Sequence, residues 1–466
     1  MPVTAAANQS RHWPQLAALS LAMLLPSLGT SITNVALPTL ARSFDATMAE
    51  VQWVVIAYLL SVTSLIVGAG RLGDLVGRRR LLLAGMALFS AASAVCAVSP
   101  SLSILIAARS VQGAGGAVMM TLTVAMVGDL VPEDRTGSAM GLLGTVSAVG
   151  TALGPTLGGA LIAASSWPSV FAFLAALGVV SVMAGSALFP AAARAARHPT
   201  SIDLPGLALL ALSLGTLSAA LTLGGRLSGL ALLGLLITST VGFAGFVLTE
   251  TRAPAPLVRL DLLRERTLGA GLASLMLVSA VVMATLVVGP FYLSGVLGLD
   301  PIETGMVMSV GPAVAAMTGV PAGRLVDQLG SFPVIVAGLL AVMLGSLLLT
   351  ALPGLFGVAG YAASLVVMTF GYAMFQAGNM TAIMQRTEKD HRGVTSALLG
   401  LSRNMGLIWG ASAMAALYAA GPRLAETIGF GAGSGAGIGA VFSGAACLAA
   451  VSLGAVLWGQ QGLSEE

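Results

Sequence analysis

The sequence predicts an all-α membrane protein that crosses the bilayer about fourteen times. Two observations support this fold class. Only 8% of the residues are charged, whereas soluble domains usually contain about a quarter, and 57% are hydrophobic. A chain of 466 residues with so few charges could not cover its surface in water. Lipid is therefore the expected solvent for most of the chain.

Apolar stretches of the roughly 20 residues that a membrane helix needs recur along the whole chain. The pair 205–249 and the glycine-rich start of the last stretch leave twelve or thirteen spans as alternatives to fourteen. The first stretch is too long for a cleaved signal peptide and is expected to be a retained helix. We expect spans at 16–40, 50–72, 80–99, 102–127, 137–163, 168–189, 205–225, 229–249, 268–297, 303–325, 333–352, 356–384, 393–420 and 437–459.

The arginines indicate the orientation of these spans. Most of them, including the run Arg78 to Arg80, fall on the same side as the N-terminus, and only Arg42, Arg226 and Arg423 fall in loops on the other side. Because positively charged loops stay in the cytoplasm, both termini are expected there. The positive charges form no block that would bind nucleic acid.

One segment of the chain is repeated. GRLGDLVGRRR, from Gly70 to Arg80, recurs in weaker form as GRLVDQLGSFP, from Gly323 to Pro333. Internal repeats around a central cavity are typical of secondary transporters. We therefore expect a six-helix bundle in residues 1–190, a linker with two inserted helices in 191–265, and a second six-helix bundle in 266–466.

With its first copy between the second and third spans, this segment resembles the signature of the major facilitator superfamily. The chain is similar, over nearly its whole length, to the fourteen-helix drug:proton antiporter branch. The resemblance implies a gate in which Gly70 and Gly73 allow close helix approach and Asp74, Arg78 and Asp129 form a charge network. The alternative is that these charges only anchor the topology. Alternating access and a bacterial inner membrane location are further expectations.

Two other spans carry motifs of the same family. RSVQGAGGA in the fourth span begins with Arg109. This arginine lies as deep as Asn34 of the first span, so the two are expected to meet, with Gln112 one turn further in, serving either transport or a structural tie. The fifth span contains a glycine motif around Gly154 and Pro155. Small residues at this spacing favour close helix packing, and the proline bends the helix. In the family this pattern accompanies exporters, so Gly154 and Pro155 are further candidate gating residues.

The first span departs from the family pattern. The segment GTSITNVALP begins with Gly29, where the branch normally has an aspartate linked to cation recognition or proton coupling. None of the 18 acidic residues is expected deep in a span. The best placed carboxylate for a proton is Glu303, at the mouth of the tenth span. A cavity without acids should disfavour cations and accept neutral or anionic solutes.

A second polar cluster is expected between the twelfth and thirteenth spans, at similar distances from the loop that joins them. It is a candidate substrate site, with a purely structural network as the alternative. Its members are Tyr372, Phe375, Gln376, Asn379, Arg403 and Asn404.

These features together predict a transporter that exports small lipophilic or weakly anionic molecules, with proton antiport implied by the resemblance. An uncoupled facilitator or anion exchanger is the first alternative, and a non-transporting membrane receptor or assembly factor is the second. No nucleotide cradle, catalytic triad or metal-ligand spacing is found in the sequence, so we expect no enzyme activity, no cofactor and no metal. The expected partners are the substrate, protons and the bilayer, and we expect a monomer.

Overall fold

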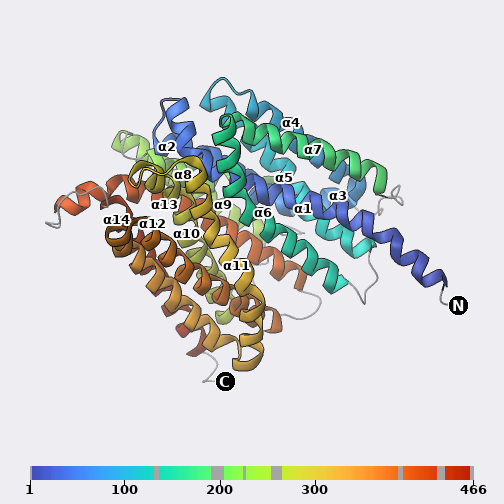
Figure 1. Ribbon diagram of the computed structural model, residues 1–466. Helices are drawn as coiled ribbons and strands as arrows, with labels where there is room; N and C mark the ends of the chain where they lie inside the picture. Colours follow the sequence, from blue (N-terminus) through green and yellow to red (C-terminus); the bar gives the residue numbers. More distant parts are fainter. Residues whose placement is uncertain are drawn as a thin grey trace.

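The computed structural model describes residues 3–130, 136–189, 204–223, 227–252, 265–386, 392–427 and 436–461 of the chain. Every regular element in these residues is an α-helix (Figure 1). The helices are α1 (Val3–Ser43), α2 (Met48–Val51), α3 (Trp53–Val76), α4 (Arg78–Ala97), α5 (Leu102–Leu130), α6 (Thr136–Ala164), α7 (Pro168–Leu188), α8 (Leu204–Leu223), α9 (Gly229–Arg252), α10 (Arg266–Gly295), α11 (Pro301–Leu329), α12 (Ser331–Arg386), α13 (Arg392–Thr427) and α14 (Ala436–Gln461).

The described helices account for the fourteen predicted membrane crossings. Among them, 12 are long and apolar enough to span a bilayer. One of these, α12, breaks at Gly357, where φ is 56° and ψ is −130°, so the chain turns back and α12 crosses twice. The predicted span 393–420 lies in α13, which is not one of these 12 helices but packs against two of them, α10 and α14. The four-residue α2 only leads into α3.

The two copies of the repeated segment adopt the same backbone turn. Gly77 ends α3 with a φ of 100° and donates its N–H to the carbonyl of Gly73. Gly330 ends α11 with a φ of 84° and donates its N–H to the carbonyl of Val326. An L side chain is strained at such φ values, which explains the glycine at this position in both copies.

The helices that follow the two turns also pack alike. A Cβ atom on Gly115 of α5 would lie 2.8 Å from the carbonyl oxygen of Gly85 on α4. A Cβ atom on Gly371, in the second part of α12, would lie 2.6 Å from the carbonyl oxygen of Gly338 in the first part. Such contacts between backbones are how small residues join helices in lipid. The sequence repeat is therefore also a structural repeat.

The helices pack as two groups with a hairpin beside them. Within the first group α1 packs on α6, α3 and α4 on α5, and α4 on α7; within the second, α10 packs on α13 and α14, and α12 on α11 and α14. The main link between the groups is the contact of α6 with α11. These contacts support the proposed division into 1–190, 191–265 and 266–466, whose boundaries at 190–203 and near 253–264 lie outside the described residues.

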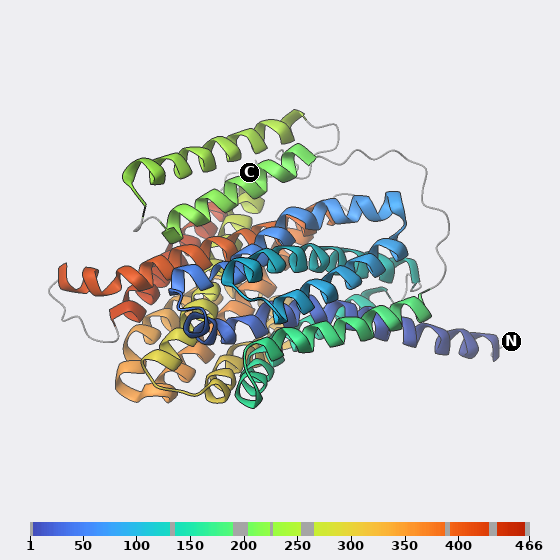
Figure 2. The same cartoon turned by 90° about the horizontal axis from the view of Figure 1, so that it is seen from above.

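The inserted hairpin of α8 and α9 lies along one side of the molecule and contacts one helix of each group, α3 and α13 (Figure 2). Ser213 and Ser239 join its two helices by reciprocal hydrogen bonds of 3.0 Å from each hydroxyl to the other residue's carbonyl. The indole Nε1 of Trp53 on α3 donates to the Thr222 hydroxyl of α8 at 3.1 Å. Residues 224–226, between the two helices in the sequence, lie outside the described residues.

The contact of Gly371 with Gly338 gives a test of the fold. We expect Gly371→Ala to lower the melting temperature in detergent, because the added methyl group would lie against backbone that cannot move aside. Gly319→Ala in α11 is the matched control, since no neighbouring atom lies within 4 Å of its Cβ position. Alanine is favoured over glycine inside a helix by about 0.5–1 kcal/mol, so the control should be unchanged or slightly stabilised. Equal melting temperatures for the two variants would contradict the packing.

Candidate functional site

A buried arginine lies at the centre of the first helix group. Arg109 of α5 is 0% exposed. Its Nε donates to the carbonyl of Val54 on α3 at 2.9 Å. Its Nη1 donates to the carbonyl of Gly29 on α1 at 3.5 Å and to the side-chain oxygen of Gln112. One guanidinium therefore joins α1, α3 and α5.

Aromatic rings and a chain of hydroxyl and amide groups complete the environment of the Arg109 guanidinium. The guanidinium carbon of Arg109 lies 4.3 Å from the ring centroid of Tyr58 and 5.9 Å from that of Phe171. The amide nitrogen of Gln112 donates to the hydroxyl of Ser93 on α4 at 2.6 Å. All of these groups are neutral, and the Nη2 of Arg109 has no acceptor among the described residues. Hydrogen bonds and ring faces stabilise the charge without cancelling it.

The predicted contact between Arg109 and Asn34 is wrong. Asn34 is buried, but neither atom of its amide has a hydrogen-bond partner among the described residues. The group of α1 that reaches the arginine is the backbone carbonyl of Gly29. Gln112, one turn further along α5, is a side-chain partner of Arg109.

The structural repeat has no second arginine at this position. Gly115 and Gly371 are equivalent, so the residue equivalent to Arg109, six positions earlier, is Leu365. Leu365 is buried and joins the hydrophobic core. The buried arginine of the first helix group therefore has no counterpart at the equivalent position of the second group.

The second polar cluster is divided by α10. Asn379, which is 3% exposed, donates its amide to the carbonyl of Gly271 on α10 at 3.1 Å. Ser402 of α13 donates to the next carbonyl of α10, that of Leu272, at 2.5 Å. Contacts between α12 and α13 are few. The prediction that these two helices face each other is therefore wrong, because both of them pack on α10 instead.

Arg403 is the less buried of the two arginines within spans. Its side chain is half-buried, its Nε has no partner among the described residues, and its charge lies within electrostatic range of Tyr372. Tyr372 and Gln376 are also half-buried, whereas Phe375 and Asn404 are buried. A partly accessible cation can contact a ligand, which the enclosed Arg109 cannot.

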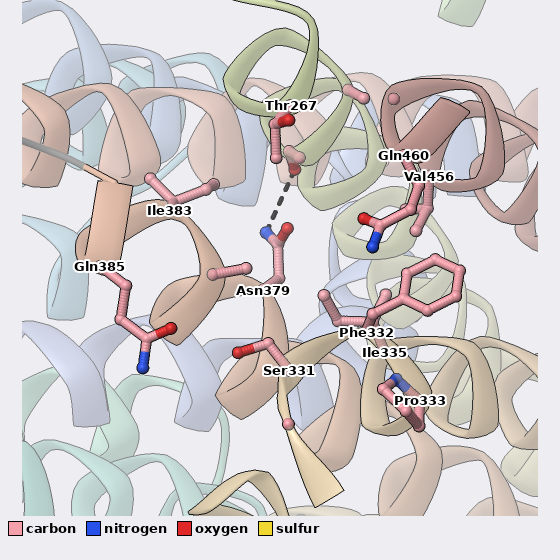
Figure 3. Close-up of a pocket in the computed structure, with 15 residues that line it drawn as sticks. Thr267, Ser331, Phe332, Pro333, Ile335, Asn379, Ile383, Gln385, Val456 and Gln460 are labelled. Atoms are coloured by element: carbon pink, nitrogen blue, oxygen red, sulfur yellow. Dashed lines mark hydrogen bonds between the residues drawn. The ribbon is translucent and has the colours of Figure 1, made fainter. Parts of the chain in front are cut away.

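Asn379 also lines a cavity of about 290 Å³ between the ends of α10, α12 and α14 (Figure 3). All of its lining residues belong to the second helix group, so it does not lie between the two groups. Neither Arg109 nor Arg403 is among the residues that line it.

The two helix groups meet at a seam between α6 and α11. Pro155 has no N–H to donate, and the N–H of the next residue, Thr156, donates to the hydroxyl of Ser309 at 3.1 Å. The two hydroxyls of this pair share a further hydrogen bond of 2.6 Å. Cβ atoms on Gly159 or Gly305 would overlap carbonyls of the opposite helix, so the backbones touch here.

This seam lies at the end of the molecule that carries α2. The helices α1 and α6 run in parallel, since Gly150 packs on Leu24 and Gly158 on Ile32. Phe44, just after α1, accordingly contacts Trp167, just after α6, with ring centroids 5.3 Å apart. The predicted gating residue Gly154 faces Ser31 of α1 rather than α11. Ser309 had no signal in the sequence that could have identified it.

The predicted gate lies at the end of the molecule away from α2, and the structure describes part of it. A Cβ atom on Gly73 would overlap the side chain of Leu122, and one on Gly70 would lie 3.3 Å from Thr121, so both glycines allow α3 to approach α5. Arg78 donates to the carbonyl of Ala125 on α5 at 3.4 Å. Asp74 and Asp129 are on α3 and α5, but their side chains lie outside the described part of the structure. Their charge network stays a prediction.

Two carboxylates bear on the expected lack of buried acids: Glu303 lies at a helix start as predicted, whereas Glu250 is buried. Glu303 is exposed and forms a capping box at the start of α11, in which its backbone N–H donates to Asp300 and its carboxylate accepts the N–H of Asp300 at 3.0 Å. Glu250, predicted to follow a span, is 3% exposed within α9. The helix runs past the apolar stretch and turns Glu250 onto the same face as Ser239, Gly242 and Phe246. It is the one buried carboxylate among the described residues.

Known proteins provide an independent comparison. Residues 19–411 match the profile of the Major Facilitator Superfamily. The chain is 30% identical over 390 residues to the uncharacterized transporter YebQ of Escherichia coli K12, covering 83% of this chain and 85% of that protein. It is 29% identical over 418 residues to the tetracenomycin C resistance and export protein of Streptomyces glaucescens, covering 88% and 77%.

The fold has a close match among solved structures. The crystal structure of the peptide transporter POT in complex with sulfate superposes with a TM-score of 0.69 at 16% sequence identity, covering 94% of this chain and 93% of that one. The profile, the relatives and the helical architecture agree, and none of them points to an enzyme. The chain belongs to the Major Facilitator Superfamily and is a multi-pass membrane transporter of small molecules.

Proposed function

We propose that this transporter exports small lipophilic or weakly anionic molecules from a bacterial cytoplasm, by alternating access and as a monomer. The Streptomyces glaucescens relative, named as a resistance and export protein, supports the direction of transport. Both termini would lie in the cytoplasm, as the distribution of arginines predicts.

The observation that carries the proposed substrate class is the uncompensated positive charge within the spans. Neither Arg109 nor Arg403 pairs with a carboxylate among the described residues, and the one buried carboxylate, Glu250, is in the separate α8–α9 hairpin. A positive potential in a medium of low dielectric constant repels cations and attracts anions. Arg403, which is only half-buried, would contact the substrate, while Arg109 would add to the potential from within the first group.

The seam supports the proposed alternating access. The hydrogen bonds of Thr156 with Ser309 hold α6 against α11 at the α2 end, and they cross from one helix group to the other. Pro155 has no N–H, so the carbonyl of Thr151 loses its helical donor and α6 is weakened next to this contact. Opening of this end would break it, so Pro155 and the glycines around it would act as a gate between two states.

Proton antiport is the proposed coupling, with an uncoupled facilitator or anion exchanger as the alternative. Gly29 offers only a backbone carbonyl where the family branch has a carboxylate, so the proton would be carried elsewhere. Glu303 at the α2 end is the candidate. A receptor or assembly factor without transport would have little use for a seam that can open. Transport assays with the purified protein in proteoliposomes, across anionic, neutral and cationic compounds and with and without a pH gradient, decide among these functions.

The first prediction concerns charge selection by Arg403. Arg403→Gln should lower the ratio of anionic to neutral substrate transport about tenfold, which corresponds to about 1.4 kcal/mol of lost interaction. Arg403→Lys keeps the charge and should keep most of the preference. The melting temperature of both variants should stay near that of the parent, because the side chain is half-buried. A stable Arg403→Gln protein with the parent's substrate profile would refute the role of Arg403.

The second prediction concerns the seam. Ser309→Ala removes the acceptor of the Thr156 N–H in the closed arrangement, at a cost of about 1–3 kcal/mol. The population open at the α2 end should rise about tenfold. Distances between spin labels on the α2 ends of α6 and α11 would measure this, after replacement of Cys96 and Cys447.

Ser294→Ala is the control for the seam, since the Ser294 hydroxyl donates to the carbonyl of Pro290 within α10. It removes a hydroxyl without touching α6. The role of the seam would be disproved by identical distance distributions for Ser309→Ala and the control.

The third prediction concerns the proton. Glu303→Gln should abolish the pH dependence of transport and leave α11 intact, because glutamine also completes a capping box. Asp327→Asn, an exposed carboxylate at the other end of α11, is the control and should retain the parent's pH dependence. Retained pH dependence in Glu303→Gln would remove Glu303 from the mechanism. A parent without pH dependence would favour the facilitator.

A further inference from the structure

The cavity in the second helix group, which the proposed transport does not use, has the features of a ligand site. Its volume is about 290 Å³. It is walled by the start of α10, both ends of α12 and the end of α14 (Figure 3). The residues that line it are Thr267, Ala270, Gly271, Gly330, Ser331, Phe332, Pro333, Ile335, Asn379, Ala382, Ile383, Gln385, Val456, Gly459 and Gln460.

Among the described residues, the wall is polar and carries no ionisable side chain. The buried Asn379 forms its floor and is held in place by its hydrogen bond to the carbonyl of Gly271. Ser331 is half-buried on the wall, while Gln385 and Gln460 are exposed toward the mouth. Hydroxyl and amide groups both donate and accept hydrogen bonds. An uncharged group with several hydroxyls therefore matches this wall, whereas an ammonium group would lack a counter-charge.

The cavity lies at the level where the spans leave the membrane. The span of α10 begins at Arg266, directly before Thr267, and the span of α14 ends at Gln460. The ring of Trp458 is 56% exposed, and the guanidinium of Arg266 lies 5.5 Å from its centroid. Exposed tryptophans collect at the interface between membrane and water. The rim thus combines an interfacial aromatic ring with a cation, at the depth of lipid phosphates.

The size of the cavity restricts the ligand further. Pockets for drug-sized molecules range from about 300 to 1,000 Å³, so this one suits a smaller group. A group bound here would also stay within one helix group, away from the α6–α11 seam. A lipid headgroup has the required size, and its acyl chains would remain in the bilayer.

We propose that this cavity binds an anionic phospholipid with an uncharged polyol headgroup, such as phosphatidylglycerol. The phosphate lies against Arg266, where an arginine forms strong charge-assisted hydrogen bonds. The headgroup hydroxyls enter the cavity and bond to Ser331, Asn379 and the two glutamines. Asn379 then serves lipid binding rather than substrate binding.

Lipid binding to the full-length protein in detergent tests this proposal without any transport measurement. Native mass spectrometry would compare short-chain phosphatidylglycerol, phosphatidylethanolamine and phosphatidylcholine, with glycerol 3-phosphate as the headgroup without acyl chains. The expected order places phosphatidylglycerol above both zwitterionic lipids, with no binding of glycerol 3-phosphate. Equal binding of the three lipids would overturn the proposal, and tight binding of glycerol 3-phosphate would show a soluble ligand instead.

Three variants locate the binding. Arg266→Gln should weaken phosphatidylglycerol binding about tenfold through the loss of a charge-assisted contact. Arg252→Gln, an exposed arginine at the end of α9, is the matched control and should bind as the parent does. Glu265→Gln removes the exposed carboxylate next to Arg266 and should strengthen binding. If both arginine variants weaken phosphatidylglycerol binding equally, the effect comes from the net charge of the protein, and the proposed site is refuted.

A fourth variant tests the interior of the cavity. Ser331→Leu fills it and removes one hydroxyl, and should reduce the preference for phosphatidylglycerol over phosphatidylethanolamine. Its melting temperature without added lipid reports whether the fold is intact, and binding would be compared at matched folded fractions. An unchanged preference in folded Ser331→Leu would exclude the cavity as the headgroup site.

Discussion

Close contact between helix backbones is the constraint on which the rest of this structure depends. In lipid, apolar side chains gain little from leaving one helix surface for another, so helices are joined by packing at short range. Gly115 on Gly85, Gly371 on Gly338 and the α6–α11 seam are contacts of this kind. They fix the depth and rotation of each helix. The positions of Arg109 between three helices and of Asn379 against α10 follow from them.

The sequence predicted the helices well because each crossing is a long apolar run bounded by charges or glycines. It predicted the repeat because a positive φ at Gly77 and Gly330 excludes other residues, which leaves a visible pattern. The limits of helices were less accessible, since a helix can continue beyond its apolar stretch. Glu250 was placed outside its helix for that reason. The break of α12 at Gly357 depends on one residue among many glycines.

The candidate site was predicted in part. The burial of Arg109 and its bond to Gln112 could be inferred from spacing along one helix. Its bonds to Val54 and Gly29 could not, because backbone carbonyls carry no signal in the sequence. The pairing of α12 with α13 failed because depth alone does not determine the rotation of a helix. Contacts across the seam, such as Thr156 with Ser309, depend on how two groups of helices meet, which no local pattern encodes.

The hairpin of α8 and α9 touches both groups, and this has a mechanical consequence. Its two helices are tied to each other by Ser213 and Ser239, so the hairpin is a stiff unit. It is anchored to α3 through the bond between Trp53 and Thr222, and α8 also packs against α13. If the groups rotate against each other, as the proposed alternating access requires, the hairpin cannot keep both of these contacts unchanged, so one of them has to shift.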